Sequence, residues 1–511
     1  MYSRLARALM VVVGVAATGA FAASATDPKY RITDIGTLGG HFTGGNAMNK
    51  SGQITGYSGI SGDVLSHAFI WRNDGTPMLD LGTLGLVLGS SSRGSWGQAI
   101  NSSGQVAGSV DRGNYIDLAF LWKNNGRPAI SLGTLYGIDS DASAINDSGQ
   151  VTGTSDGGAA FVWLNDGRPM QDLGTLGGNQ AGGEDINASG QVTGSAQPSY
   201  QISHAFFWKN DDTPMQDLGT LGGTNSRGYF INSSGQIAGT SEVKPFGIAS
   251  HAFLWKNNGT PMVNLGTLGG AISGPSAVNE FGQVAGTSTV HGLDTSTERA
   301  FVWRNDGTRM LNLGTLGGPA SSGYDINAAG WVVGGADTSS NRTHAFLWRN
   351  DGRGMRDLNN LIDPTDPLKP FVVLDYGLVI NDAGDIMASG YDTRDTGGWL
   401  RTYFVRGSSL ALSPLSLAFG NQKANTTSAA KAVTVQNNGT AAVLITSIRL
   451  AGANAGQFAF THNCGTSLAG KATCTINVKF KPATKGAKSA VLNVNGGGGG
   501  LRSVSLTGTG I

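Results

Sequence analysis

The chain has 511 residues, of which 80 are glycine, so glycine is present at more than twice its usual share of about 7%. Charged residues make up only 14%, and 35 basic against 34 acidic side chains leave a formal net charge of +1. Because the chain has no net positive field to attract phosphate groups, we expect no nucleic-acid partner. The 39% of hydrophobic residues is enough for folded cores and excludes a mainly disordered chain.

The amino terminus has the pattern of an export signal. Arg4 and Arg7 precede an apolar run over residues 8–17, and small residues follow between positions 20 and 25. The run is too short for a membrane-spanning helix, which needs about 20 apolar residues. We therefore expect a signal peptide over residues 1–25, no transmembrane segment in the mature protein, and a secreted, extracellular or periplasmic location.

Three short motifs recur in a fixed order between residues 30 and 405. The first ends on an asparagine followed by a turn such as Ser-Gly-Gln-Val, the second is Ala-Phe-x-Trp, and the third is Leu-Gly-Thr-Leu-Gly-Gly. The first glycine of the third motif recurs at intervals of 41 to 51 residues, at Gly36, Gly82, Gly133, Gly174, Gly219, Gly266 and Gly314. Repeats of this length are typical of propeller blades or of paired helices.

The composition of the units favours strands over helices. They are rich in Val, Ile, Thr, Phe and Trp, and their Asn-Gly, Asp-Gly and Ser-Gly steps suit tight hairpins. Each unit therefore predicts four antiparallel strands. In a third strand such as residues 205–208, Phe206 and Trp208 point to one face while Ala205 and Phe207 point to the other. Both faces are apolar, so each sheet is expected to pack between two others.

Eight such units predict an all-β fold, an eight-bladed β-propeller over residues 30–405. The strand over residues 30–36 has no strands of its own unit before it, and the last unit, around Ile380, has no fourth strand after residue 405. The N-terminal strand is therefore expected to complete the last blade and close the ring. Seven blades is the alternative, if the degenerate last copy lies outside the ring.

The repeated motifs also carry a resemblance to a known family. The combination of His-Ala-Phe-x-Trp, Asp-Leu-Gly-Thr-Leu-Gly-Gly and Ile-Asn-x-Ser-Gly-Gln-Val resembles the HAF family of bacterial extracellular repeats, over residues 30–405. The resemblance implies a secreted or surface-located protein. It brings no established activity and no functional residues.

Residues 412–511 predict a C-terminal immunoglobulin-like β-sandwich, because short alternating strands such as 432–435 and 476–480 are separated by turn signals. Segments such as 506–510 resemble the choice-of-anchor D domain, which is related to the ASH sandwiches. The only two cysteines, Cys464 and Cys474, lie in this region. In an exported protein such a pair most simply forms a disulfide.

Two recurring features suggest metal binding but have simpler interpretations. One histidine position recurs in four units, and we expect strand-end packing there, because equivalent positions in separate blades are too far apart to share a metal. Asp185 and Asp325 begin motifs that match half of a calcium loop, but the bidentate glutamate is missing. The asparagine two positions later is expected to cap its own turn. The histidines are His67, His204, His251 and His344.

The sequence contains no Gly-x-Ser-x-Gly elbow in a strand-to-helix context, no His-Glu-x-x-His and no phosphate loop. We therefore predict no catalytic residue, no metal site and no cofactor. The connections between second and third strands vary in length and composition, so they are the expected carriers of recognition. Aromatic residues there could stack on sugars, anchor a protein, or pack on a neighbouring blade. These candidates are Tyr115, Tyr200, Phe246, His291 and Trp399.

The leading prediction is an exported, non-enzymatic binding or structural protein whose loops meet a glycan or protein ligand. The alternative is an extracellular carbohydrate-active enzyme, a glycosidase or lyase, with a site assembled from the same loops. A convergent pair of carboxylates about 5 to 10 Å apart would distinguish the enzyme.

Overall fold

The computed structural model describes residues 30–86, 92–114, 116–245, 247–407, 410–414, 416–437, 443–497 and 500–511. The predicted signal peptide, residues 1–25, lies outside them. Within these residues the regular structure is almost entirely β, apart from the four-residue helix α1 (Leu358–Leu361) and two short 3-10 turns, η1 (Thr295–Thr297) and η2 (Ala455–Gln457). No helix in the described part of the chain is long and apolar enough to cross a membrane.

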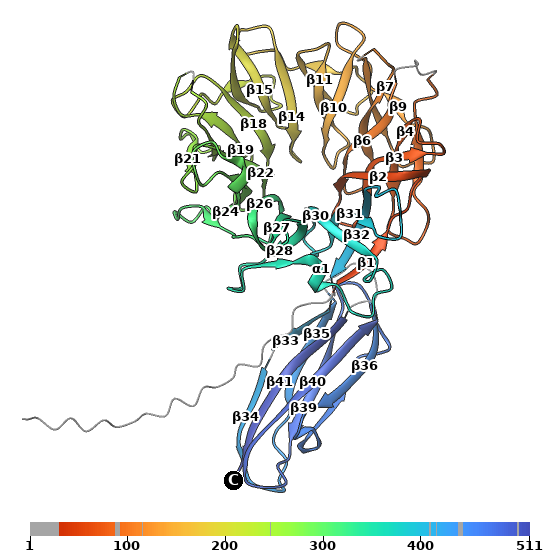
Figure 1. The fold of residues 1–511 in the computed structure, drawn as a ribbon, viewed down its shortest axis with the longest axis vertical. Helices are drawn as coiled ribbons and strands as arrows, with labels where there is room; N and C mark the ends of the chain where they lie inside the picture. The colour runs from red at the N-terminus through yellow and green to blue at the C-terminus, as the bar shows by residue number, and fades with distance from the viewer. Residues whose placement is uncertain are drawn as a thin grey trace, which may run out of the picture.

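The described chain between Tyr30 and Gly407 contains eight units of four antiparallel strands, numbered here from the N-terminus (Figure 1). Within each unit the first strand pairs with the second, the second with the third and the third with the fourth, as predicted. A single bridge between Ser66 and Gly94 also joins units 1 and 2.

The strands of units 1 to 4 are, unit by unit, β2 (Gly39–Met48), β3 (Ile54–Ile60), β4 (Ser66–Trp71), β5 (Leu79–Gly82); β6 (Gly94–Ile100), β7 (Val106–Asp111), β8 (Asp117–Trp122), β9 (Ile130–Ser131); β10 (Ser140–Ile145), β11 (Val151–Ser155), β12 (Ala159–Trp163), β13 (Gln171–Asp172); and β14 (Ala181–Ile186), β15 (Val192–Ser199), β16 (Ile202–Trp208), β17 (Gln216–Asp217). Those of units 5 to 8 are β18 (Ser226–Ile231), β19 (Ile237–Glu242), β20 (Ser250–Trp255), β21 (Val263–Gly266); β22 (Ser273–Val278), β23 (Val284–Ser288), β24 (Arg299–Trp303), β25 (Leu311–Asn312); β26 (Gly317–Ile326), β27 (Val332–Thr338), β28 (Thr343–Trp348), β29 (Met355–Asp357); and β30 (Val372–Ile380), β31 (Ile386–Asp392), β32 (Arg401–Gly407), β1 (Tyr30–Asp34).

The fourth strand of unit 8 is the N-terminal strand β1. It runs antiparallel to β32, with Tyr30 opposite Gly407 and Asp34 opposite Tyr403. The predicted pairing of the first strand with the last unit is therefore confirmed.

The sheets pack face to face through apolar side chains on both faces, as the third strands predict. In β12, Phe161 and Trp163 belong to a core shared with unit 2, whereas Ala160 and Val162 belong to a core shared with unit 4. All four side chains are buried, with exposed fractions of 7% or less. A sheet that packs between two others, such as that of unit 3, thus contributes to two hydrophobic cores.

A chain of asparagine hydrogen bonds links consecutive units. In unit 4, Asn187 accepts backbone bonds from Ser189 and Gln191 of its own turn, at 3.1 and 3.0 Å, which confirms the predicted cap. Its Nδ2 also donates to the carbonyl of Asn232 in unit 5, at 3.1 Å. The same inter-unit bond recurs from Asn49 to Asn101, Asn101 to Asn146, Asn146 to Asn187, Asn232 to Asn279, Asn279 to Asn327, Asn327 to Asn381, and from Asn381 to Lys50 in unit 1.

The C-terminal region is a sandwich of two sheets with one shared apolar core. Cys464 and Cys474 form a disulfide that joins the segment after β37 to β39, so the predicted pairing is confirmed. One sheet contains β33 (Leu410–Ser413), β35 (Lys431–Asn437), β39 (Thr473–Phe480) and β37 (Phe458–His462). The other contains β34 (Ser416–Gln422), β41 (Gly500–Gly510), β40 (Gly486–Gly497), β36 (Val443–Ala451) and β38 (Ser467–Leu468).

Candidate functional site

The two ends of each unit differ. At one end, which we call the turn face, connections of nearly constant length join the first strand to the second and, in units 1 to 7, the third to the fourth. In unit 3, Asn165 of one such turn donates to the Ser148 carbonyl of the other, at 3.3 Å. At the opposite end, which we call the loop face, segments of varied length join the second strand to the third, from two residues in unit 4 to ten in unit 6, and the fourth strand leads to the next unit.

Exposed apolar side chains gather on the loop face. Most of the large hydrophobic residues exposed in the described part of the eight units lie in its segments, whereas Phe281 is exposed at the turn face. Monomeric proteins seldom expose many apolar residues on one surface unless the surface binds something. The loop-face residues are Val64, Tyr136, Ile138, Tyr200, Ile248, Leu293, Trp399 and Leu400.

The five predicted ligand-binding residues do not form one cluster. Tyr115 and Phe246 lie outside the described residues. Tyr200 is 78% exposed in the β15–β16 turn, and His291 is exposed between β23 and η1. Among the described aromatic rings, Trp399 has ring partners, whereas none is found for Tyr200 or His291.

Trp399 belongs to an aromatic platform that unit 8 and unit 1 build together. Its ring is stacked on His41, with centroids 5.7 Å apart, and lies 6.3 Å from Phe42. Phe42 in turn contacts Tyr57 edge-on at 6.3 Å. We call Trp399, His41, Phe42 and Tyr57 the aromatic platform. Trp399 and Tyr57 remain 41% and 36% exposed, so their rings are accessible to a ligand.

Glycines make room for the platform. A Cβ on Gly44 would lie 2.4 Å from the Tyr57 ring, and one on Gly397 would lie 2.3 Å from Nε1 of Trp399. Neither distance is tolerable, so a side chain at either position would displace the ring beside it. The two glycines therefore fix where these aromatic side chains lie.

A carboxylate lies at the rim of the platform. Asp63 accepts a hydrogen bond from the His41 backbone amide at 2.9 Å and is also paired with the His41 imidazole. These side-chain and backbone bonds hold the pKa of Asp63 below its usual range. The platform thus combines flat apolar rings with an ionised acceptor, an arrangement suited to a ligand that has both an apolar face and hydroxyl groups.

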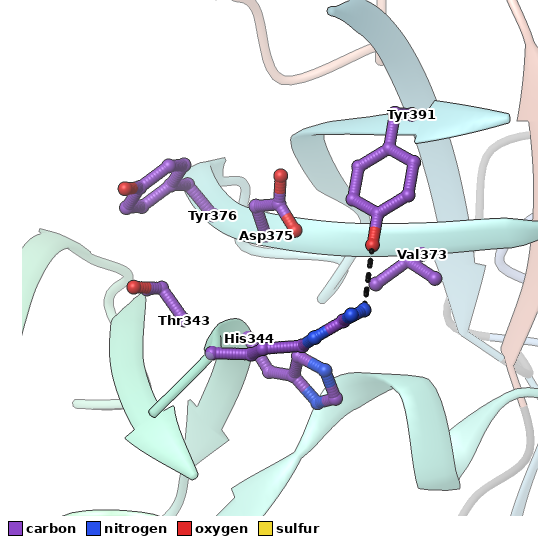
Figure 2. A pocket seen from close by; sticks show the side chains of 7 residues that line it. Thr343, His344, Val373, Asp375, Tyr376 and Tyr391 are labelled. Carbon is purple, nitrogen blue, oxygen red and sulfur yellow. Dashed lines mark hydrogen bonds between the residues drawn. The ribbon is translucent and has the colours of Figure 1, made fainter. Parts of the chain in front are cut away.

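A hollow lies between units 7 and 8, and we call it the seam cleft (Figure 2). Its volume is about 360 Å³. Arg342 comes from the loop that precedes β28, so the cleft opens on the loop face. The lining residues are Arg342, Thr343, His344, Val373, Asp375, Tyr376 and Tyr391.

The charged groups of the seam cleft come from both units. Arg342 Nη1 donates to the Tyr391 hydroxyl at 3.5 Å, and His344 Nδ1 is bonded to Asp357 at 2.8 Å, so its Nε2 is not used in that bond. Burial raises the pKa of Asp375 to about 6, although the nearby charges of His344 and Arg342 lower it.

The seam cleft exists because strands β27 and β30 depart from the pattern of the other units. The bulge between Leu374 and Tyr376 adds a residue, Asp375, to β30, and such bulges redirect side chains. Gly335 of β27 lies beneath Tyr376, and a Cβ on it would be 2.6 Å from that ring. Serine or threonine occupies the equivalent position in most other units. Comparison of the aligned repeats could have revealed this departure from the sequence.

The recurring histidines are hydrogen-bonded side chains. Each contacts a residue of the neighbouring fourth strand through Nδ1, so the prediction of simple strand-end packing was incomplete. The bonds join His67 to Asp80 at 2.9 Å, His204 to Asp217 at 2.9 Å, His251 to Asn264 at 3.0 Å and His344 to Asp357 at 2.8 Å. In unit 3, where Ala159 replaces the histidine, the Tyr136 hydroxyl bonds the equivalent Asp172 at 2.6 Å.

Comparison with known proteins identifies the C-terminal region. The family model described as ASH, "Abnormal spindle-like microcephaly-assoc'd, ASPM-SPD-2-Hydin", matches residues 408–504. The sandwich is therefore an ASH domain, with an immunoglobulin-like fold. No curated protein matches the chain.

Three solved structures illustrate what the chain is similar to. The ASH/PapD-like domain 7 of human CEP192 is 15% identical, with a TM-score of 0.17, over 20% of this chain and 86% of that one. TolB from Acinetobacter baumannii is 13% identical, with a TM-score of 0.33, over 50% and 62% of the two chains. Puromycin hydrolase is 12% identical, with a TM-score of 0.39, over 69% and 58%. The chain thus spans less than two thirds of the latter two proteins.

Proposed function

We propose that this is an exported, non-enzymatic binding protein whose loop face holds a glycan on the aromatic platform. The stacked, half-exposed ring of Trp399 beside His41 is the observation that carries this proposal. Export rests on the signal-peptide pattern of residues 1–25. The ASH domain would mediate a surface or protein contact.

We further propose that the eight units are the blades of a closed β-propeller of the HAF type, and that the sandwich is a choice-of-anchor D variant of the ASH fold. The pairing of β1 with β32 supports closure, as does the asparagine chain, which returns from Asn381 to Lys50 in unit 1. A closed ring would also explain why Trp399 and His41, far apart in sequence, form one surface.

The chemistry of the platform favours a sugar ligand. A sugar ring has an apolar face of C–H groups, which loses contact with water when it covers an aromatic ring. The hydroxyl groups at its edge need acceptors, and the Asp63 carboxylate provides one. A protein partner fits the platform less well, because the core of a protein–protein interface is usually depleted in charged residues, whereas Asp63 lies at the rim of only four rings.

The test is a polysaccharide binding screen with the mature chain beginning at Thr26. We expect saturable binding to at least one polysaccharide, and Trp399→Ala is expected to weaken it about tenfold, since losing one aromatic stacking partner costs about 1 to 3 kcal/mol where nucleic-acid bases stack on such rings. Phe281→Ala is the matched control, because it removes a 65% exposed aromatic ring from the turn face. Equal loss in both variants, or binding unaffected by Trp399→Ala, would contradict the proposal.

A carbohydrate-active enzyme is the second candidate, and the raised pKa of Asp375 favours it, because a general acid needs a proton near neutral pH. Against it, Asp375 is the only carboxylate among the described residues that line the seam cleft, and glycosidases use two. Assaying released reducing ends in the same wells separates the two: product that disappears in Asp375→Asn would favour the enzyme.

A further inference from the structure

We propose that the seam cleft is a second binding site and that it takes a hexuronic acid, the carboxylate-bearing sugar unit of acidic polysaccharides. The inference goes beyond glycan binding on the aromatic platform and concerns different residues, from units 7 and 8. It rests on two opposite charges, Arg342 and Asp375, that both line the cleft without being paired to each other.

Arg342 is the group that selects a carboxylate. Among the described residues it forms no ion pair, and its side-chain hydrogen bond is the long one of 3.5 Å to the Tyr391 hydroxyl. Its fork of N–H donors is therefore free to bind both oxygens of a carboxylate, the geometry that guanidinium groups favour. The Tyr391 hydroxyl lies beside it and can donate to the same group.

Asp375 is the group that selects hydroxyls. Its carboxyl has no hydrogen-bond partner among the described side chains and backbone groups, although it is half-buried. A polar group in this environment gains from a donor supplied by a ligand, because leaving it unpaired costs free energy. Two vicinal sugar hydroxyls could donate to its two oxygens, and Nε2 of His344 can bond a third.

The remaining lining fits a single sugar ring. Tyr376 offers an aromatic wall, held over Gly335, and Val373 adds an apolar side chain. A volume of about 360 Å³ is at the lower end of small-molecule sites, which suits one monosaccharide unit. A simple anion would satisfy Arg342 but leave Asp375 unpaired, and a neutral sugar would do the reverse.

The probes are glucuronate, galacturonate, glucose and acetate, titrated into the full mature chain and followed by saturation-transfer NMR. We expect saturable binding of at least one uronate, and weaker binding of both glucose and acetate. Arg342→Gln is expected to weaken uronate binding about tenfold, the effect of losing a charge-assisted bond, without altering the response to glucose. Asp375→Asn replaces one acceptor oxygen by an N–H donor, so it should weaken the binding of both uronate and glucose.

Three results would overturn the inference: no saturable uronate binding, acetate binding as tight as uronate, or an Arg342→Gln variant that binds uronate normally. Arg342 is exposed, so its replacement should leave the fold intact, and a melting curve checks this. Tyr391→Phe, which removes the neighbouring hydroxyl, is the second variant and should also weaken uronate binding. Trp399→Ala should leave the monosaccharide result unchanged, so this site and the aromatic platform can fail independently.

Discussion

The side-chain amide of Asn187 donates to the backbone carbonyl of Asn232 in the next unit, while its carbonyl oxygen caps its own turn. One buried residue therefore serves two adjacent sheets, and leaving its partners unsatisfied should be costly. We expect Asn187→Ala to lower the free energy of unfolding by about 2 to 4 kcal/mol, measured by denaturant titration.

The matched control for that variant is Ser189→Ala. Ser189 lies in the same turn, is exposed and contributes its backbone amide, which alanine retains. We expect a change within about 0.5 kcal/mol. Similar losses in both variants would mean that the turn is generally sensitive and that the inter-unit bond contributes little.

Two carboxyls, Asp185 of β14 and Asp325 of β26, are expected to make stability depend on pH. Burial raises the pKa of Asp185 to about 7 and that of Asp325 to about 6, well above the ordinary value for an aspartate. Between these values the folded protein holds protons that the unfolded chain releases, so each group's contribution to stability falls as pH rises from about 4 to 7. Other carboxyls have lowered pKa values and act in the opposite direction. The pH dependence of the wild-type free energy of unfolding therefore does not isolate the contribution of these two groups.

The measurement is therefore a difference between wild type and Asp185→Asn, taken at several pH values. The variant cannot titrate at this position, so the stability of wild type relative to it should decrease by on the order of 1 to 3 kcal/mol between pH 4 and pH 7. Asp325→Asn should show the same sign. A difference that stays constant with pH, or that grows, would contradict the expectation.

The disulfide between Cys464 and Cys474 should stabilise the ASH domain. Closing this loop of ten positions restricts the unfolded chain, so Cys464→Ser combined with Cys474→Ser should cost about 2 to 3 kcal/mol. Calorimetry should show the loss in the transition of the sandwich. Reduction of wild type should reproduce it, and an unchanged melting profile in both experiments would refute the prediction.

The requirement for glycine at position 44 should come from the Tyr57 ring, which occupies the space of a Cβ there. Gly44→Ala places a Cβ where the tyrosine ring now lies, so we expect a loss of about 1 to 3 kcal/mol. Tyr57→Ala in the same chain should relieve the clash, and the coupling energy from the double-mutant cycle measures it. Additive effects of the two substitutions would show that the ring does not need this space.

The sequence was most informative where the pattern is local and repeated. Alternation in strands such as β12 predicted cores on both faces, and motif order predicted that β1 completes unit 8. Helix α1 was missed, because after the last strand of unit 7 Asn359 stands where the other units have the first glycine of the third motif. The Asn359 side chain accepts a hydrogen bond from the backbone of Leu374. Strand β34 was missed because its partner β41 is distant in sequence and parallel to it.

The candidate sites were harder to predict because each requires two units. Trp399 could be recognised as a loop aromatic, but its neighbour His41 belongs to unit 1, more than 350 positions earlier. Arg342 and Asp375 likewise meet only because a bulge in β30 redirects one of them. Sequence reasoning assigns residues to loops, whereas which loops share a surface depends on how the sheets are packed.

The pairing of β1 with β32 also has a consequence for biogenesis. Arg401 of β32 and Asp34 of β1 form an ion pair although they are separated by 367 positions, so this sheet cannot form until nearly the whole eight-unit region has been synthesised. Contacts of such long range slow folding, and before they form, β1 and β32 each lack the other as a neighbour. A nascent chain thus remains incompletely folded until late in synthesis, which is compatible with the export that we propose.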